Sequence, residues 1–259
     1  MGIDESDLTA ERHDLFLLQS STLSKRFEPR RINFYPCDTI AASREQLAAL
    51  VSRFRKKGSD TTIGFADSVT LHEIGAFDLI GTLPGIRVIN PFERFPDGKY
   101  KAFGEQPPGR LDLPPEEYYA LTERVLQQMR ESLMADIFVT GANAITLDGQ
   151  IVSTDGTGNR VAGMIFGPKK VIIVVGVNKL VRNVEQALQR NRNVAAPLNF
   201  LRHNRKHDTR FATPCLKLGY CTDCSHPGRP CLNTVIIDGA TAVNKDRLHL
   251  ILVNEPLGL

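Results

Sequence analysis

Apolar positions recur at helical spacing in several stretches of the chain. One stripe predicts a helix that begins at a capping box of Ser43 and Gln46 and ends before Gly58. Pro114 and Pro115 precede acidic residues and an apolar stripe, which predicts a helix to about residue 134. Further helices are predicted within the first 30 residues, after a cap at Ser68, and over about 180–190.

Between these helices lie short runs rich in β-branched and aromatic residues. The run Val171–Val175 is apolar without alternation, which is typical of a central strand buried on both faces. Asp148 and Gly149 separate two β-like runs and predict a hairpin. The remaining strands are predicted at 31–37, 61–66, 136–140 and 248–253, with one more at 86–89 inside a proline-rich and glycine-rich loop over 81–115. Strands alternating with helices favour an α/β fold, with a mostly parallel sheet flanked by helices.

Composition sets limits on the class of protein. The chain has 259 residues, of which 42% are hydrophobic and 24% charged, and this suits one large α/β domain or two small ones. It contains no apolar run of the about 20 residues that a membrane span needs. The first 14 residues lack the basic and apolar segments of a secretory signal, so we expect a soluble cytoplasmic protein.

Positive charge is concentrated in one part of the chain. The formal net charge is only +3, but nine Lys and Arg face three Asp and Glu between Arg182 and Arg229. Nucleic-acid binding would call for interleaved aromatic residues or a known motif, and the segment offers neither. We therefore expect a solvated basic face and no nucleic-acid partner.

Four of the five cysteines lie within 17 residues, at Cys215, Cys221, Cys224 and Cys231. In a chain of this length without a secretory signal, such clustering favours metal ligands over disulfides. Four thiolates suit a tetrahedral zinc ion and equally a [4Fe–4S] cluster, while four unligated thiols remain the alternative. The fifth, Cys37, is expected to be an ordinary buried residue.

Short polar residues stand beside glycines where predicted strands end. In parallel sheets the carboxyl ends of the strands form the usual ligand crevice, so we expect these residues to surround a small anion. The anion-binding candidates are Asn143, Asn159, Arg160, Asn178 and Lys179. Carboxylates would repel an anion unless they transfer protons or bind a metal, so Asp155 and Glu255 are the candidate catalytic residues. The alternative is that the glycine-rich segments are ordinary turns.

Several motifs together resemble the LUD-domain family, which is named for lactate utilisation. The resemblance is dense from about residue 136 onward and thinner before it. It is carried by the segments 140–146, 148–149, 155–162, 167–172, 176–179, 195–199 and 213–215, and by Ser68–Leu71 and Glu73–Gly75. Ser68 and Thr70 are added as ligand-binding residues on the strength of this resemblance. The family pattern has a glycine before this serine, where the chain has Ala66 and Asp67.

The resemblance implies a fold similar to the ribose-5-phosphate isomerase (NagB/RpiA) and CoA-transferase superfamily. It divides the chain into an N-terminal helical extension over 1–30 and a single α/β domain over 31–259, with a cysteine loop at 213–233. It implies a metal-bearing accessory protein in the oxidation of lactate or a related 2-hydroxy acid, with a [4Fe–4S] cluster favoured over zinc. An iron–sulfur or redox partner subunit and a homo-oligomer are expected partners. The alternative is a stand-alone enzyme acting on a phosphate or CoA ester, with a structural zinc site.

Overall fold

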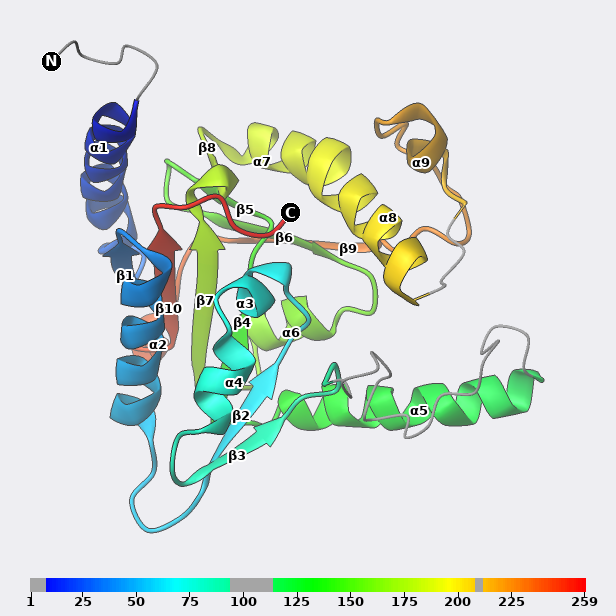
Figure 1. Cartoon of the computed structure of the whole chain (residues 1–259), viewed down its shortest axis with the longest axis horizontal. Coiled ribbons are helices and arrows are strands. Elements are labelled where there is room, and N and C mark those ends of the chain that lie inside the picture. The colour runs from blue at the N-terminus through cyan, green and yellow to red at the C-terminus, as the bar shows by residue number, and fades with distance from the viewer. Residues whose placement is uncertain (1–7, 94–113, 208–211) are drawn as a thin grey trace, which may run out of the picture.

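The computed structural model describes residues 8–93, 114–207 and 212–259. Six parallel strands form its main sheet, in the order β1-β10-β7-β4-β2-β3 (Figure 1). Their bounds are β1 Ile32–Cys37, β2 Thr61–Phe65, β3 Ile86–Ile89, β4 Ile137–Thr140, β7 Lys170–Gly176 and β10 Leu248–Val253. The predicted α/β fold with a mostly parallel sheet is confirmed.

Strand β7 lies inside this sheet, between β10 and β4. Val171 and Ile173 pack into the core on one face of the sheet, whereas Ile172 and Val174 pack into the core on the other. Both faces of the strand are therefore buried, which is why its sequence shows no polar alternation. The prediction of a central strand at Val171–Val175 is confirmed.

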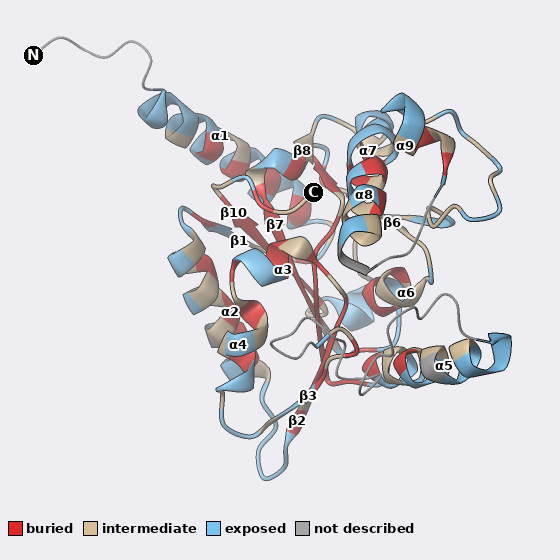
Figure 2. Ribbon diagram, turned by 45° about the vertical axis from the view of Figure 1, so that its right-hand side comes forward, coloured by how far each residue is buried: buried red, intermediate tan, exposed pale blue. Residues whose placement is uncertain are grey.

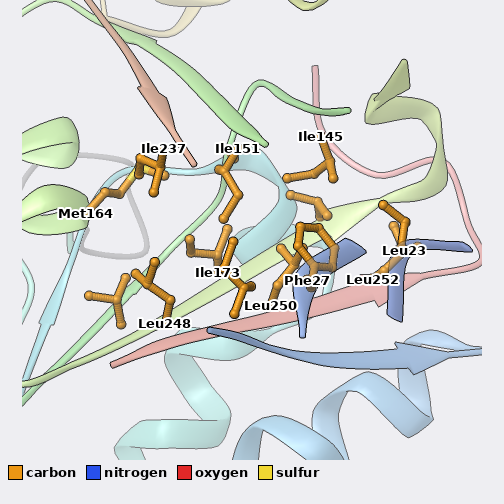
Figure 3. Packing of buried hydrophobic residues seen from close by; sticks show 14 of the residues in the cluster. Leu23, Phe27, Ile145, Ile151, Met164, Ile173, Ile237, Leu248, Leu250 and Leu252 are labelled. Carbon is orange, nitrogen blue, oxygen red and sulfur yellow. The ribbon is translucent and has the colours of Figure 1, made fainter. Parts of the chain in front are cut away.

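Helices cover one face of the main sheet. They are α2 Ile40–Phe54, α3 Val69–Glu73 and α4 Ala76–Gly81, and their buried side chains join one core cluster with the strands. The other face packs against α1 Thr9–Phe27, α6 Asn159–Ile165 and a second sheet. Figure 2 shows buried strands between these two more exposed layers. Figure 3 shows Leu23 and Phe27 of α1 against Leu250 and Leu252 of β10, so the N-terminal helix contributes to the core.

The second sheet has the strand order β8-β5-β6-β9. Its strands are β5 Ala144–Thr146, β6 Ile151–Asp155, β8 Leu180–Val181 and β9 Asn233–Ile237. β5 and β6 pair antiparallel around Asp148-Gly149, and Gly149 has the positive φ (92°) that such a turn requires. The predicted hairpin is confirmed, and it places the end of β6 beside the main sheet.

The remaining elements lie around the carboxyl edge of the main sheet or connect its strands. They are α5 Pro115–Ser132, the 3₁₀ turn η3 Val177–Lys179, α7 Val184–Arg190, the π-helical segment η4 Asn191–Ala195, α8 Ala196–His207, α9 Pro214–Leu218 and the 3₁₀ turn η5 Ala242–Asn244. α7, η4 and α8 follow one another without a break. No helix in the described parts of the chain is both long and apolar enough to cross a membrane.

Two local predictions are wrong. The helix predicted to begin at Ser43 begins earlier, because Thr39 is its cap and accepts a hydrogen bond from the Ala42 amide at 3.1 Å. Ser43 is buried inside the helix, where its hydroxyl donates to the Ile40 carbonyl at 2.7 Å. The helix predicted over 180–190 starts only after the short strand β8, with Asn183 as its cap. Of the predicted loop over 81–115, residues 94–113 lie outside the described part.

Candidate functional site

A cavity of about 380 Å³ opens at the carboxyl edge of the main sheet. Its floor comes from the segments that follow β2, β4 and β7, as expected for a parallel sheet. Its walls come from α5, from the loop between β6 and α6, and from η4 and α8, and Pro230 and Cys231 of the cysteine loop complete the lining. Segments far apart in the sequence thus meet at one place.

Six of the nine predicted ligand and catalytic residues line this cavity. They are Ser68, Asn143, Asp155, Asn159, Arg160 and Lys179. Their convergence follows from the topology, since β2, β4 and β7 are adjacent and β6 is tied to β4 through the hairpin. The placement agrees with the expected crevice, while the role of each residue stays a prediction.

Arg160 and Asn143 form a polar wall of the cavity. The side-chain oxygen of Asn143 accepts hydrogen bonds from the Thr154 amide at 2.7 Å and from Arg160 Nη2 at 3.4 Å. Arg160 Nη2 also donates to the Thr154 carbonyl. Its Nε is buried and finds no partner among the described residues. Among the described residues, the guanidinium of Arg160 thus forms hydrogen bonds with neutral oxygens and none with a carboxylate.

Asp155 lies at the end of β6, where its carboxylate orders the following loop. One oxygen accepts from the Gly156 amide at 2.8 Å, and the other accepts from the Arg160 amide at 3.0 Å. Both carboxylate oxygens therefore hold backbone at the start of α6. Asp155 lines the cavity, but its geometry is that of a residue that positions Arg160.

Lys179 ends the turn η3, which leads away from β7. Its side chain is 5% exposed, and its Nζ donates to the Thr70 hydroxyl at 2.9 Å. Gly258, at a positive φ of 67°, covers this pair: a Cβ there would lie 2.9 Å from the lysine Nζ. Burial, together with the nearby charges of Arg190 and Arg160, lowers the pKa of Lys179 to about 7, although Glu73 acts in the opposite direction.

Ser68 and Thr70 lie on the segment that follows β2. Ser68 lines the cavity against Gly141, where a Cβ would stand 2.5 Å from the serine hydroxyl. Thr70 is fully buried behind Lys179 and is absent from the lining. Thr70 therefore holds the lysine by a hydrogen bond, and its role as a ligand-binding residue stays a prediction.

Asn178 and Glu255 lie outside the lining of the cavity, so their predicted convergence with the other candidates is wrong. The Asn178 side chain accepts from the Leu257 amide at 3.0 Å and holds the C-terminal segment. Glu255 accepts from the Ile40 amide at 2.9 Å, at the start of α2. The positive end of a helix stabilises a carboxylate. The Glu255 side chain, which follows β10, is therefore bound at the start of α2 and not in the cavity.

The comparisons with known proteins support one family. The model of the LUD domain matches residues 23–253, which is most of the chain. The chain belongs to the LUD-domain family. The resemblance seen in the motifs is therefore confirmed. No curated protein matches this LUD-domain chain significantly.

Two solved structures are similar to this LUD-domain protein at low identity. One is a DUF162 family protein from Deinococcus radiodurans, with 14% identity, coverage of 94% of this chain and 97% of the other, and a TM-score of 0.41. The other is eIF2B beta from Chaetomium thermophilum, with 14% identity and a TM-score of 0.27. That match covers 54% of this chain and 39% of eIF2B beta. These likenesses carry no argument about function.

Sequence reasoning missed three polar residues of the cavity. Asp67 forms an ion pair with Arg202 of α8 at 3.2 Å and a hydrogen bond with His72 at 3.2 Å. Burial alone would raise the pKa of Asp67, but the contacts with His72 and Arg202 outweigh it and hold the pKa far below its usual value. Asn191 begins the π-helical segment, and its buried side-chain oxygen has no partner among the described residues. The sequence signal that could have found Asp67 was the departure from the expected family pattern at Ala66 and Asp67.

Of the four clustered cysteines, Cys231 lines the cavity. Cys215 is buried on α9 beside Thr213, whereas Cys221, Cys224 and Cys231 are half-buried. The amide of Asp223 donates to the Cys221 sulfur at 3.3 Å. Burial raises the pKa of Cys231, Arg229 lowers it, and Cys221 and Cys224 lie close enough to raise it.

These cysteines do not form a closed metal site. Within 8–93, 114–207 and 212–259, no three His, Cys, Asp or Glu side chains are grouped closely enough to hold an ion. The predicted metal-bearing loop is therefore not shown. The donor chemistry of four thiols still fits zinc or an iron–sulfur cluster, but loading would require the sulfurs to move together. The metal role of Cys215, Cys221, Cys224 and Cys231 remains a proposal.

Proposed function

We propose that this LUD-domain protein binds a small organic anion in the cavity and acts in the oxidation of lactate or a related 2-hydroxy acid. The observation that carries the proposal is the charge of Arg160. Its guanidinium lines the cavity, and among the described residues its side chain forms hydrogen bonds with the neutral oxygens of Asn143 and Thr154. A half-buried cation without a carboxylate partner is a natural binding site for a carboxylate.

The carboxylates of the cavity do not compensate this charge. Asp67 is engaged by Arg202 and His72, and Asp155 is engaged by backbone amides. Lys179 adds positive charge whenever it is protonated. The net field inside the cavity therefore favours an anion over a neutral or cationic ligand.

The other polar groups suit a ligand that also carries a hydroxyl. The side-chain oxygen of Asn191 is an acceptor without a partner among the described residues, and the Ser68 hydroxyl faces the same cavity. A 2-hydroxy acid offers a carboxylate for Arg160 and a hydroxyl donor for Asn191. The volume of about 380 Å³ lies at the small end of ligand sites, which fits a compact acid.

Binding is tested by calorimetry with L-lactate, inorganic phosphate and coenzyme A as separate ligands. Lactate binding should be at least about tenfold weaker in Arg160→Gln, because a charge-assisted hydrogen bond is lost. The matched control is Arg87→Gln, which makes the same change at an exposed position on the edge strand β3. Equal affinity in both variants would contradict the proposal. Binding of phosphate or coenzyme A, with none of lactate, would instead favour the stand-alone enzyme of phosphate or CoA esters.

We propose further that the four clustered cysteines bind a [4Fe–4S] cluster, with zinc as the alternative. When bound, a cluster would accept electrons released as a 2-hydroxy acid becomes a 2-oxo acid, and a redox partner protein would remove them. The support is the place of Cys231, which lines the anion cavity, and the amide hydrogen bond to Cys221. The residues that would hold the metal thus lie next to the proposed ligand.

The metal is tested by elemental analysis of protein purified without oxygen. Iron with acid-labile sulfide and a brown colour would identify the cluster, and zinc alone would identify the structural site. Cys224→Ala should lose the metal, whereas the control Cys37→Ala should retain it, because Cys37 lies on β1. Neither metal above trace would exclude both forms.

A further inference from the structure

Lys179 has an environment that differs from that of an ordinary anion-binding lysine. It is nine-tenths buried, yet it lines the cavity. Its Nζ donates to the Thr70 hydroxyl, and among the described residues it forms no ion pair with a carboxylate. A buried ammonium without a counter-ion is costly, so this position favours an uncharged amine.

The surroundings strengthen that preference. Arg160 and Arg190 both act on Lys179 through their charges, and Gly258 covers it from the C-terminal side. Glu73 attracts the proton, but its carboxylate already accepts from the Gly258 amide at 2.6 Å. With its pKa lowered to about 7, much of the amine is unprotonated and nucleophilic at neutral pH.

We propose that Lys179 forms a Schiff base with a 2-oxo acid bound in the cavity. The inference rests on the proposed anion site, since Arg160 is the group that would hold the carboxylate of the acid. Lys179 and Arg160 line the same cavity, so an acid whose carboxylate binds Arg160 would lie in the cavity that the lysine also lines. A 2-oxo acid is also what oxidation of a 2-hydroxy acid produces.

The chemistry balances without any further reactant. The lone pair of Nζ attacks the carbonyl carbon, an N–C bond forms, and the carbonyl oxygen becomes a hydroxyl in a carbinolamine. That oxygen then leaves as water with the two hydrogens that the amine gives up, and a C=N bond remains. The Thr70 hydroxyl, which accepts from Nζ, holds the amine in place for the attack. The step is reversible, so Lys179 would capture and release the acid.

The experiment traps the imine. Protein is incubated with pyruvate and sodium cyanoborohydride, and the product is analysed by intact mass and peptide mapping. We expect one reduced adduct per chain, located on Lys179. Lys179→Arg keeps the positive charge and should give none, whereas Lys169→Arg, on an exposed lysine, should label like the unmodified protein. Acetone, a ketone without a carboxylate, should not label.

Labelling of the unmodified protein at several pH values keeps the test independent of how the variants fold. In the unmodified protein the labelling rate should rise with pH and level off above about pH 7, because the pKa of Lys179 is about 7. Adducts spread over exposed lysines, or a rate that still rises toward the pKa of an ordinary lysine, overturn the inference. Pyruvate binding that depends on Arg160 but gives no adduct overturns the Schiff base alone. Absence of both binding and adduct overturns the anion site as well.

Discussion

Two lysines at opposite ends of β7 have contrasting surroundings. Lys170 opens the strand at the amino edge of the sheet, where its Nζ forms an ion pair with Asp246 at 2.5 Å and lies 4.8 Å from the centre of the Phe54 ring. Lys179 follows the strand at the carboxyl edge, is more deeply buried, and donates a hydrogen bond to the Thr70 hydroxyl. Within the described part of the chain, the less exposed of the two lysines is thus the one without a carboxylate counter-ion.

Polar residues near Lys170 are paired within the fold, whereas some polar atoms near Lys179 are not. At the amino edge, Asp136 forms an ion pair with Lys56 at 2.7 Å and accepts from the Thr62 amide and hydroxyl. At the carboxyl edge, Arg160 and Asn191 both keep a buried polar atom without a partner among the described residues. Buried polar groups are normally satisfied within the fold, so the unsatisfied atoms of these two residues at one cavity support the proposed ligand site.

Charged groups at the amino edge therefore stabilise the fold, whereas we expect those at the carboxyl edge to serve ligand binding. Pairs such as Lys170 with Asp246 connect segments that are distant in the sequence, and their removal should cost stability. A buried basic group without a counter-ion, such as Lys179, costs stability to keep, and we expect it to serve ligand chemistry. Substitutions at the two edges should consequently differ in the sign of their effect.

The largest loss of stability is expected in the middle of β7, far from the charged groups at both edges of the sheet. Val174→Asp places a carboxylate in the middle of β7, at a side chain with no exposed surface, and should lower the free energy of unfolding by at least about 4 kcal/mol. Urea unfolding followed by circular dichroism measures the change. Val88→Asp on the edge strand β3, where the side chain is 37% exposed, is the matched control and should cost far less. Similar losses in both variants would contradict the buried central position of β7.

The amino edge should be sensitive to acid through His249. Burial lowers the pKa of this ring to about 4 from its usual 6.5, against the opposing effect of Asp246. Between these values the unfolded chain binds the proton and the folded chain does not, so stability falls as the pH falls from 6.5 to 4. The loss should amount to about 3 kcal/mol. His249→Gln should lack this part of the pH dependence, whereas His13→Gln, on an exposed ring, should retain it.

At the carboxyl edge, Lys179→Met should raise stability. At pH 7 the unfolded chain holds the lysine proton, whereas about half of the folded molecules have given it up because the folded pKa is about 7, and methionine removes the cost of burying this amine. We expect a gain of about 2 kcal/mol, since loss of the Thr70 hydrogen bond offsets part of it. The unmodified protein should gain up to about 1.4 kcal/mol per pH unit between pH 7 and 10.5, because the folded pKa lies below the unfolded one. Unfolding curves across this range should show a flatter slope for Lys179→Met.

The elements that the sequence predicted well are those dominated by local pattern. The apolar run of β7, the hairpin at Asp148-Gly149 and the helix after Pro114 each follow from neighbouring residues alone. The convergence of Asn143 and Lys179 was predictable too, because parallel strands end at a common edge.

What could not be predicted depends on partners distant in the sequence. The pairing of Asp67 with Arg202 spans 135 residues, and no local pattern signals it. Glu255 was misplaced because its partner is the amide of Ile40, which the strand order β1-β10 brings alongside. Thr39 was passed over as a cap because Ser43 and Gln46 also have capping spacing, and only the packing of α2 decides between them.

The smallest change in stability is expected for Lys170→Met. Its sign, set against that of Lys179→Met, distinguishes a structural lysine from a functional one. Lys170→Met removes the ammonium from Asp246, whose side chain is 45% exposed, so water replaces part of the lost interaction. We expect a loss of about 1 kcal/mol, smaller still in high salt because screening already weakens the pair. Methionine keeps the apolar contact with Phe54, so the change reports mainly on charge. Measured side by side at pH 7, Lys170→Met should destabilise the protein and Lys179→Met should stabilise it. If both variants lost stability, Lys179 would be a structural residue like Lys170, and the functional meaning given to its missing counter-ion would have to be withdrawn.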